Sequence, residues 1–151
     1  MARVNEIDAS ALNKVIADIE RLPYEMQSGV VDAALEAGGE VLAEAGRSAA
    51  ISSVRRPDEA TGQMANSIKP FKPKTSYAGG TIAIAPSGAR RLEGKRKKAI
   101  RNAEVAFVHH YGTSKTPATN FFAKAADAAA DEAVEAAANI IMTKIDEILG
   151  G

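Results

Sequence analysis

Two stretches of the chain, residues 24–53 and 120–149, place apolar residues at three- and four-residue steps, which is the repeat of an amphipathic α-helix. At 1.5 Å per residue, the first of these helices would be about 40 Å long. The apolar stripes consist of Val31, Leu35, Gly38, Leu42, Ala45 and Ala49 in the first stretch, and of Phe122, Ala126, Ala129, Ala133, Ala137, Ile141, Ile145 and Ile148 in the second. Alanine-rich helices pack closely but bury little area per residue, so the sequence predicts two long helices and an isolated monomer of modest stability.

A glycine pair, Gly38-Gly39, lies in the middle of the first long helix, where each glycine costs up to about 1 kcal/mol relative to alanine. The pair marks either a local weak point or kink, or a place where another backbone approaches closely. The sequence leaves both interpretations open.

Shorter elements are expected in the remainder of the chain. An amphipathic helix capped by Asp8 or Ser10 runs to about Arg21, and Pro23 separates it from the long helix. A short turn of helix is predicted at 62–67. Strands are predicted at 68–76, 81–85 and 103–111, with a hairpin turn at 78–80, and the prolines in the first strand restrict it to a sheet edge.

These elements predict the α+β class. We expect two N-terminal helices, the second one long, then a small antiparallel sheet with a basic loop, and a long C-terminal helix packed on the sheet. A length of 151 residues suits a single domain, 1–151.

Charge is segregated along the chain although the net charge is zero. Residues 1–46 contain three basic and nine acidic residues, residues 69–115 contain eleven basic and two acidic, and residues 116–151 contain two basic and six acidic. The basic residues concentrate in the segment 89–102, as Arg90, Arg91, Lys95, Arg96, Lys97, Lys98 and Arg101. Such asymmetry predicts an interaction surface.

Three interpretations of the basic segment remain open. It is a solvated loop, an arm that docks on an acidic neighbour such as another copy, or a surface that contacts phosphates of DNA. Because no aromatic residue is interleaved, base stacking is not indicated, and any DNA contact would be blind to sequence.

Residues that carry chemistry are few. The chain has no cysteine, and His109 and His110 would point to opposite faces of the predicted strand, so they could not easily bind one metal ion. The run from Gly88 to Arg96 departs from a phosphate-binding loop in spacing and lacks the Ser or Thr that would bind magnesium. We expect no catalytic, cofactor or metal site. No apolar run approaches a membrane span. Because residues 1–8 contain no apolar signal core, we expect no export signal.

Two motifs remain. Residues 57–68 read PDEATGQMANSI, which resembles a Pro-x-x-Thr-Gly-x-Leu-x-x-Ser-Ile pattern with a residue added after the proline. Residues 107–122 read FVHHYGTSKTPATNFF, which resembles Val-Glu-Tyr/Phe-Gly-Thr-Ser-Lys-x-Pro-Ala-x-Pro-Phe. Here His110 lies where that pattern often has Glu, and Asn120 lies where it often has Pro.

Both patterns occur in the neck, or tail-completion, proteins of long-tailed phages, a family related to the lambda minor tail protein Z. The resemblance covers residues 30–149, and the basic segment looks like an insertion relative to short family members. The motif residues are Thr61, Gly62, Ser67, Tyr111, Gly112, Thr113, Ser114, Lys115, Pro117, Phe121 and Phe122, and we expect them to be architectural.

The resemblance implies a non-enzymatic virion protein that is made in the host cytoplasm and joins the head to the tail. Its implied partners are the head connector or stopper, the tail terminator or tail-tube proteins, and further copies of itself in a ring of roughly six or twelve subunits. The alternative is a small accessory protein that binds DNA nonspecifically through residues 90–101. A hydrolase is the weakest option.

Overall fold

The computed structural model describes residues 9–54, 56, 58–73, 81–90 and 99–150. It contains five helices among these residues: α1 (Ala9–Glu20), α2 (Tyr24–Ser52), α3 (Glu59–Asn66), α4 (Asn102–Tyr111) and α5 (Phe121–Leu149). Two short antiparallel ladders accompany them: β1 (Ile68–Phe71) pairs with β2 (Ala83–Pro86), and β3 (Ala89–Arg90) pairs with β4 (Ile100–Arg101). The predicted α+β class is confirmed.

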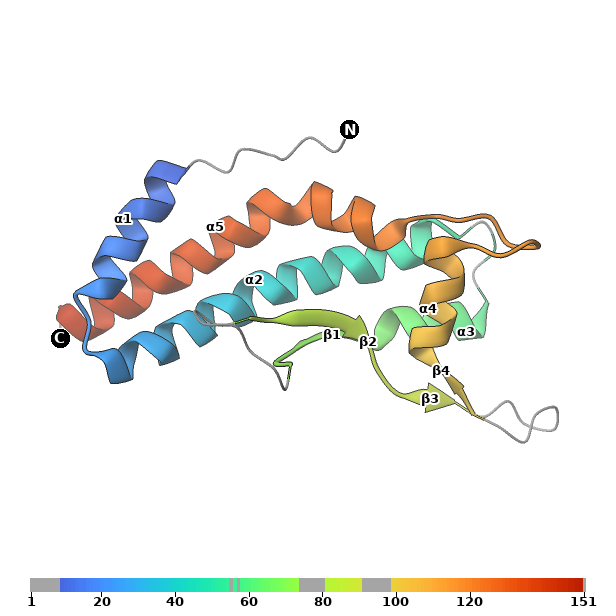
Figure 1. Cartoon of the computed structure of the whole chain (residues 1–151), viewed down its shortest axis with the longest axis horizontal. Coiled ribbons are helices and arrows are strands. Elements are labelled where there is room, and N and C mark those ends of the chain that lie inside the picture. Colours follow the sequence, from blue (N-terminus) through green and yellow to red (C-terminus); the bar gives the residue numbers. More distant parts are fainter. Residues whose placement is uncertain (1–8, 55, 57, 74–80, 91–98, 151) are drawn as a thin grey trace.

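The long helix α2 is the central element (Figure 1). Helix α5 lies antiparallel along one side of it, and β1 and β2 lie on the other side. The sequence predicts a C-terminal helix packed on the sheet; in the structure α5 packs chiefly on α2, which separates it from most of the sheet. Small residues explain this arrangement, since they let two long backbones come close over their whole length.

The glycine pair of α2 allows neighbouring elements to approach this helix closely. A Cβ on Gly38 would lie 3.0 Å from the carbonyl oxygen of Ala133 in α5, whereas a Cβ on Gly39 would lie 3.1 Å from Pro70 and 3.2 Å from Ile82 on the sheet side. The two glycines therefore face opposite neighbours, and the close-approach interpretation is confirmed.

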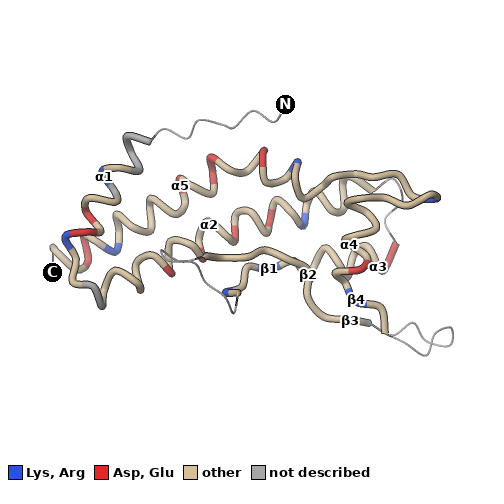
Figure 2. Tube along the Cα trace, in the orientation of Figure 1, with Lys and Arg blue, Asp and Glu red and all other residues tan. Residues whose placement is uncertain are grey.

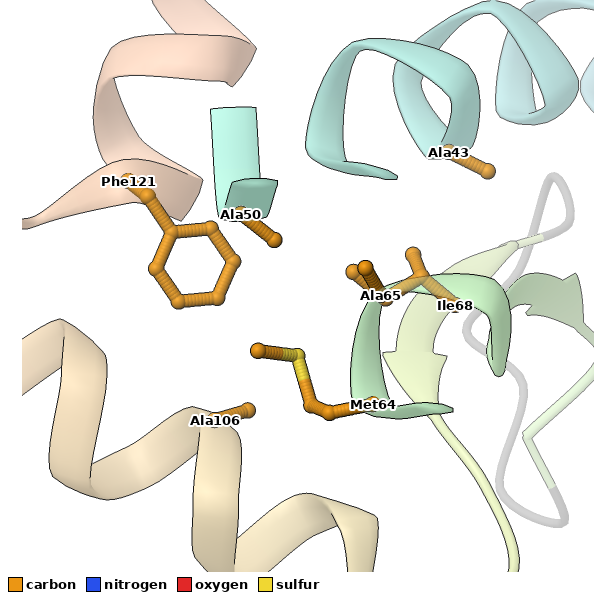
Figure 3. Close-up of a cluster of buried hydrophobic side chains, with 7 residues drawn as sticks. All are labelled: Ala43, Ala50, Met64, Ala65, Ile68, Ala106 and Phe121. Carbon is orange, nitrogen blue, oxygen red and sulfur yellow. The ribbon is translucent and has the colours of Figure 1, made fainter. Parts of the chain in front are cut away.

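Two clusters of buried side chains hold the helices together. The larger one, drawn in Figure 3, unites five elements through Ala43 and Ala50 of α2, Met64 and Ala65 of α3, Ile68 of β1, Ala106 of α4 and Phe121 of α5. The smaller one lies at the opposite end of α2 and consists of Leu22, Val30 and Ile145. Most of the larger cluster is alanine, so Phe121 and Met64 supply much of its apolar volume.

The sequence predicts a strand at 103–111, and this prediction is wrong because the structure forms helix α4 there. Apolar side chains recur at four-residue steps as well as at alternate positions, so both periods fit. Ala106 turns toward the core while Phe107 and Tyr111 stay exposed. Packing of Ala106 on Met64 and Phe121 favours the helical period (Figure 3).

The other predicted helices begin and end within a few residues of those observed, whereas the predicted strand at 68–76 is shortened to β1, and the ends of the predicted basic loop 89–102 form the β3–β4 ladder. Strand β1 ends at Phe71, and Pro70 is tolerated because each strand of a two-stranded ladder is an edge. The predicted hairpin turn at 78–80 and the cap residue Asp8 lie outside the described residues, as does the Ser10 side chain. Among the described helices, none combines the length and the apolar character that crossing a bilayer requires.

Candidate functional site

The second motif forms the corner between α4 and α5. The corner turns at Gly112, whose φ is 76° and ψ is 175°, a region that only glycine populates readily. A Cβ at this position would lie 2.6 Å from the backbone nitrogen of Ala118 and 2.8 Å from the carbonyl oxygen of Thr116. Both conformation and space therefore require glycine at this position.

The loop after Gly112 folds back onto the end of α4. The backbone N–H groups of Thr119 and Asn120 donate to the carbonyl oxygens of His109 and His110, each at 3.0 Å. These bonds satisfy carbonyls that the end of a helix otherwise leaves without a partner. Thr113 closes the loop from within, because its N–H donates to the carbonyl of Thr116 at 2.7 Å.

Side chains of the same loop differ in their roles. The hydroxyl oxygen of Thr113 accepts from the N–H groups of Lys115 and Thr116 at 3.2 and 3.0 Å. By contrast, the side chains of Ser114, Lys115 and Pro117 are exposed. The Thr113 side chain therefore holds the loop, whereas the side chains of Ser114, Lys115 and Pro117 are accessible to a partner.

The first motif begins α3. Asp58 caps the helix by accepting from the N–H of Thr61 at 2.8 Å and from its hydroxyl at 2.9 Å. Thr61 is buried, and its hydroxyl lies 3.4 Å from Nε2 of His109 in α4. Asp is one of the preferred N-cap residues, so Asp58 is a readable start signal, and the helix prediction, which starts at Gly62, overlooks it.

Other residues of the first motif end α3 and link it to the sheet. The Ser67 hydroxyl donates to the carbonyl of Met64 at 2.7 Å, and Ser67 accepts from the backbone N–H of Ser87, just after β2. Gly62 differs, because a Cβ there would meet no atom of the described residues within 4 Å. Packing among the described residues therefore does not require this glycine.

The two motifs, far apart in the sequence, meet in space. Met64, Ala65 and Ile68 from the first pack in one cluster with Phe121 from the second (Figure 3). Phe121 is fully buried, and its ring centroid lies 4.5 Å from that of half-buried Phe122. We call this unit, residues 58–68 and 107–122, the motif corner.

His109 and His110 lie on helix α4. The prediction that they point to opposite faces of a strand is therefore wrong, because no strand forms at these residues. His109 faces Thr61, whereas the ring of His110 makes an edge contact with Phe121 at 5.8 Å. Nδ1 of His110 is buried and has no hydrogen-bond partner among the residues that the structure describes. In the part of the chain that the structure describes, no group of three or more His, Asp or Glu side chains is arranged to hold a metal ion.

The basic segment is anchored at both ends. Ala89 pairs with Arg101 and Arg90 pairs with Ile100, which brings the two ends of the segment together immediately before the first residue of α4. Arg101 pairs with Glu104 in the first turn of that helix, N to O 3.2 Å. Residues Arg91, Lys95, Arg96, Lys97 and Lys98, and the side chain of Arg90, lie outside what the structure describes.

Acidic residues gather on the two long helices (Figure 2). A groove of about 480 Å³ between them is lined by Glu40 and Glu44 of α2 and by Glu132 of α5, among others. Arg47 binds both α2 carboxylates, and its hydrogen bond to Glu40 raises the pKa of the guanidinium, against an opposing effect of burial. Arg47 also donates to the carbonyl of Ile68 at 2.6 Å, which ties α2 to β1.

A second surface feature is a shallow hollow of about 250 Å³ beside α4. It is lined by Pro86, Ala103, Ala106, Phe107, His110, Tyr111 and Phe122. The hollow is mostly apolar, and of the described residues that line it, His110 and Tyr111 are ionisable. An exposed apolar surface of this kind is suited to a contact with protein.

Comparisons with protein-family models, with curated proteins and with solved structures find no match to this chain.

Proposed function

We propose that this chain is a non-enzymatic structural protein of the phage neck, which joins the head connector to the tail as part of an oligomeric ring. The observation that carries the proposal is the motif corner: the two stretches that resemble neck proteins pack against each other as one unit. Two motifs that belong to one family would be expected to act together, and here they share a buried cluster.

The chemistry of the motif corner supports an architectural role. Its polar side chains Thr61, Ser67 and Thr113 hydrogen-bond to neighbouring parts of the same chain. Its aromatic residue Phe121 fills the core. These groups hold a shape, and the exposed loop tip around Lys115 presents that shape to a neighbour.

In this function the chain is made in the host cytoplasm and ends in the virion. Its neighbours are the head connector or stopper on one side and the tail terminator or tail tube on the other. Ring closure requires each subunit to present two different complementary surfaces, and the segregation of basic and acidic residues along the sequence supports such a pair.

Deleting the gene from its phage tests the proposal. We expect DNA-filled heads and separate tails in electron micrographs, with infectivity restored when the chain is supplied from a plasmid. Labelled chain should appear at the neck of restored particles. Normal infectious particles assembled without the chain would refute the proposal.

The basic segment favours a second candidate, a protein that binds DNA without sequence preference. Seven basic residues and one acidic residue lie between positions 90 and 101. Binding to duplex DNA should then weaken with salt, with a log–log slope of about −0.9 for each phosphate contacted. Reversal of Lys95, Arg96, Lys97 and Lys98 to Glu should abolish it. Retained binding would exclude this candidate.

A further inference from the structure

We propose that the outer edge of β2 pairs with the same edge of a second copy of this chain, so that two β1–β2 ladders join into one antiparallel sheet. We call Ile82, Ala83 and Ile84, with their outward backbone groups, the β2 edge. The contact goes beyond the neck function and does not depend on it. A two-fold contact stops at two copies, whereas a ring needs a heterologous contact on other surfaces.

The hydrogen bonds of the ladder show which backbone groups point outward. The N–H of Ser87 donates to the carbonyl of Ser67 at 3.2 Å, which makes this a hydrogen-bonded pair. Because bonded and non-bonded pairs alternate in an antiparallel ladder, the Pro70–Ile84 pair turns its backbone groups away from the ladder. Pro86 also falls at an outward position. Both prolines, which lack an N–H, therefore lie where the ladder needs none.

The two edges of the ladder differ in what they offer. On β1, Pro70 has no N–H, and the carbonyl of Ile68 accepts from Arg47 at 2.6 Å. On the other edge, Ile84 presents both an N–H and a carbonyl. Ile82 does the same, because its side chain lies on the same side as that of Pro70 and so continues the alternation. Among the described residues, none hydrogen-bonds to these groups of Ile82 and Ile84.

The composition of the β2 edge leaves it open to another strand. Sheet edges are usually protected from pairing by charged side chains, prolines or bulges. Residues 81–85 read TIAIA and contain neither a charge nor a proline, and every residue of β2 is partly exposed. N–H and carbonyl groups that recur at every second residue match the backbone of an extended strand.

The β2 edge is complementary to itself. Around a two-fold axis at Ala83, Ile82 faces Ile84 of the second copy, and both residues exchange N–H···O bonds as a hydrogen-bonded pair. Shifting the register toward Pro86 would lose a bond, because proline has no N–H. Ala83 then faces Ala83 of the second copy in a closely spaced pair, with Cα atoms about 4.5 Å apart. This self-complementarity selects a second copy as the occupant.

The contact also uses an exposed aromatic residue. Phe71 is 49% exposed and lies opposite Ala83 in the ladder. In the joined sheet, the two phenylalanines flank the two alanines in one row, and their rings can lean over these small side chains. The row adds an apolar part to a contact that short strands alone would hold through backbone bonds.

Disulfide trapping tests both the contact and its register, because the chain contains no cysteine. Ala83→Cys should form a disulfide-linked dimer under mild oxidation, since Cα atoms about 4.5 Å apart suit a disulfide. Ala85→Cys, on the same face of β2, is the matched control. The register holds its two copies about 13 Å apart, which is too far for the bond. No dimer from Ala83→Cys, or as much dimer from Ala85→Cys, would overturn the proposal.

Charge at the two-fold axis gives an independent test, followed by analytical ultracentrifugation of the full chain. Ala83→Lys and Ala83→Asp should each abolish self-association, because like charges then face each other. An equal mixture of the two variants should associate again. Circular dichroism and thermal unfolding should show that both variants are folded. A mixture that stays monomeric, or a wild-type chain that is monomeric at every concentration, would refute the contact.

The aromatic row is tested in the same assay. Phe71→Ala should weaken association about tenfold, the effect of losing an interface anchor. Met142→Ala removes a similarly exposed apolar side chain on α5, across α2 from the sheet, and should leave association unchanged. Equal effects of the two substitutions would contradict the row. The gene-deletion test does not involve this contact, so the neck function stands or falls separately.

Discussion

Replacing Gly112 by alanine is the sharpest test of how the motif corner is held. The residue adopts φ 76° and ψ 175°, where a side chain costs about 1–3 kcal/mol. Its Cβ would also lie 2.6 Å from the backbone nitrogen of Ala118. That backbone cannot move freely, because the N–H groups of Thr119 and Asn120 bond to the end of α4.

The two effects act together. Overpacking against an atom that cannot yield costs about 1–3 kcal/mol, so the two costs together should be about 2–6 kcal/mol. The free energy of unfolding of a protein of this size is about 5–15 kcal/mol, and each kcal/mol lost lowers Tm by about 2–4 °C. We therefore expect Tm to fall by about 4–24 °C.

Gly62→Ala is the matched control. Gly62 lies inside α3, and a Cβ there meets nothing within 4 Å, so alanine should stabilise the helix by about 0.5–1 kcal/mol. Urea denaturation of the two variants beside the wild type gives both free energies of unfolding. Equal stability of the Gly112→Ala and wild-type chains would refute the account of the corner.

Three further substitutions probe the packing, each followed by the free energy of unfolding in urea. Phe121→Ala should cost about 3–5 kcal/mol, and the half-buried Phe122→Ala should cost less; the reverse order would contradict the larger cluster. Gly38→Ala should destabilise the protein because its Cβ meets the α5 backbone at 3.0 Å, whereas Gly29→Ala, with open space around it, should stabilise α2. Thr61→Val should cost about 1–3 kcal/mol, since it removes the hydroxyl that binds the α3 cap; an unchanged stability would show that the bond contributes nothing.

Much of the architecture follows from local sequence. The three- and four-residue repeats predict the ends of α2 and α5 to within a residue or two. Apolar residues at these steps over so long a stretch share one face only in an α-helix. The need for a turn at Gly112 can also be inferred, since glycine directly after a regular element adopts backbone conformations that other residues resist. The segregated charge, which depends on residue order alone, indicates an interaction surface.

Tertiary contacts decided what local pattern left open. The segment 103–111 has apolar residues at both two- and four-residue spacing, and only burial of Ala106 against Met64 and Phe121 selects the helix. The glycine pair of α2 fitted either a kink or a close neighbour. The structure shows close neighbours, with α5 next to Gly38 and the sheet side next to Gly39. A local sequence can fit more than one period. Which period an element adopts depends on the residues it packs against, and these lie far away in the chain, where no local pattern can indicate their positions.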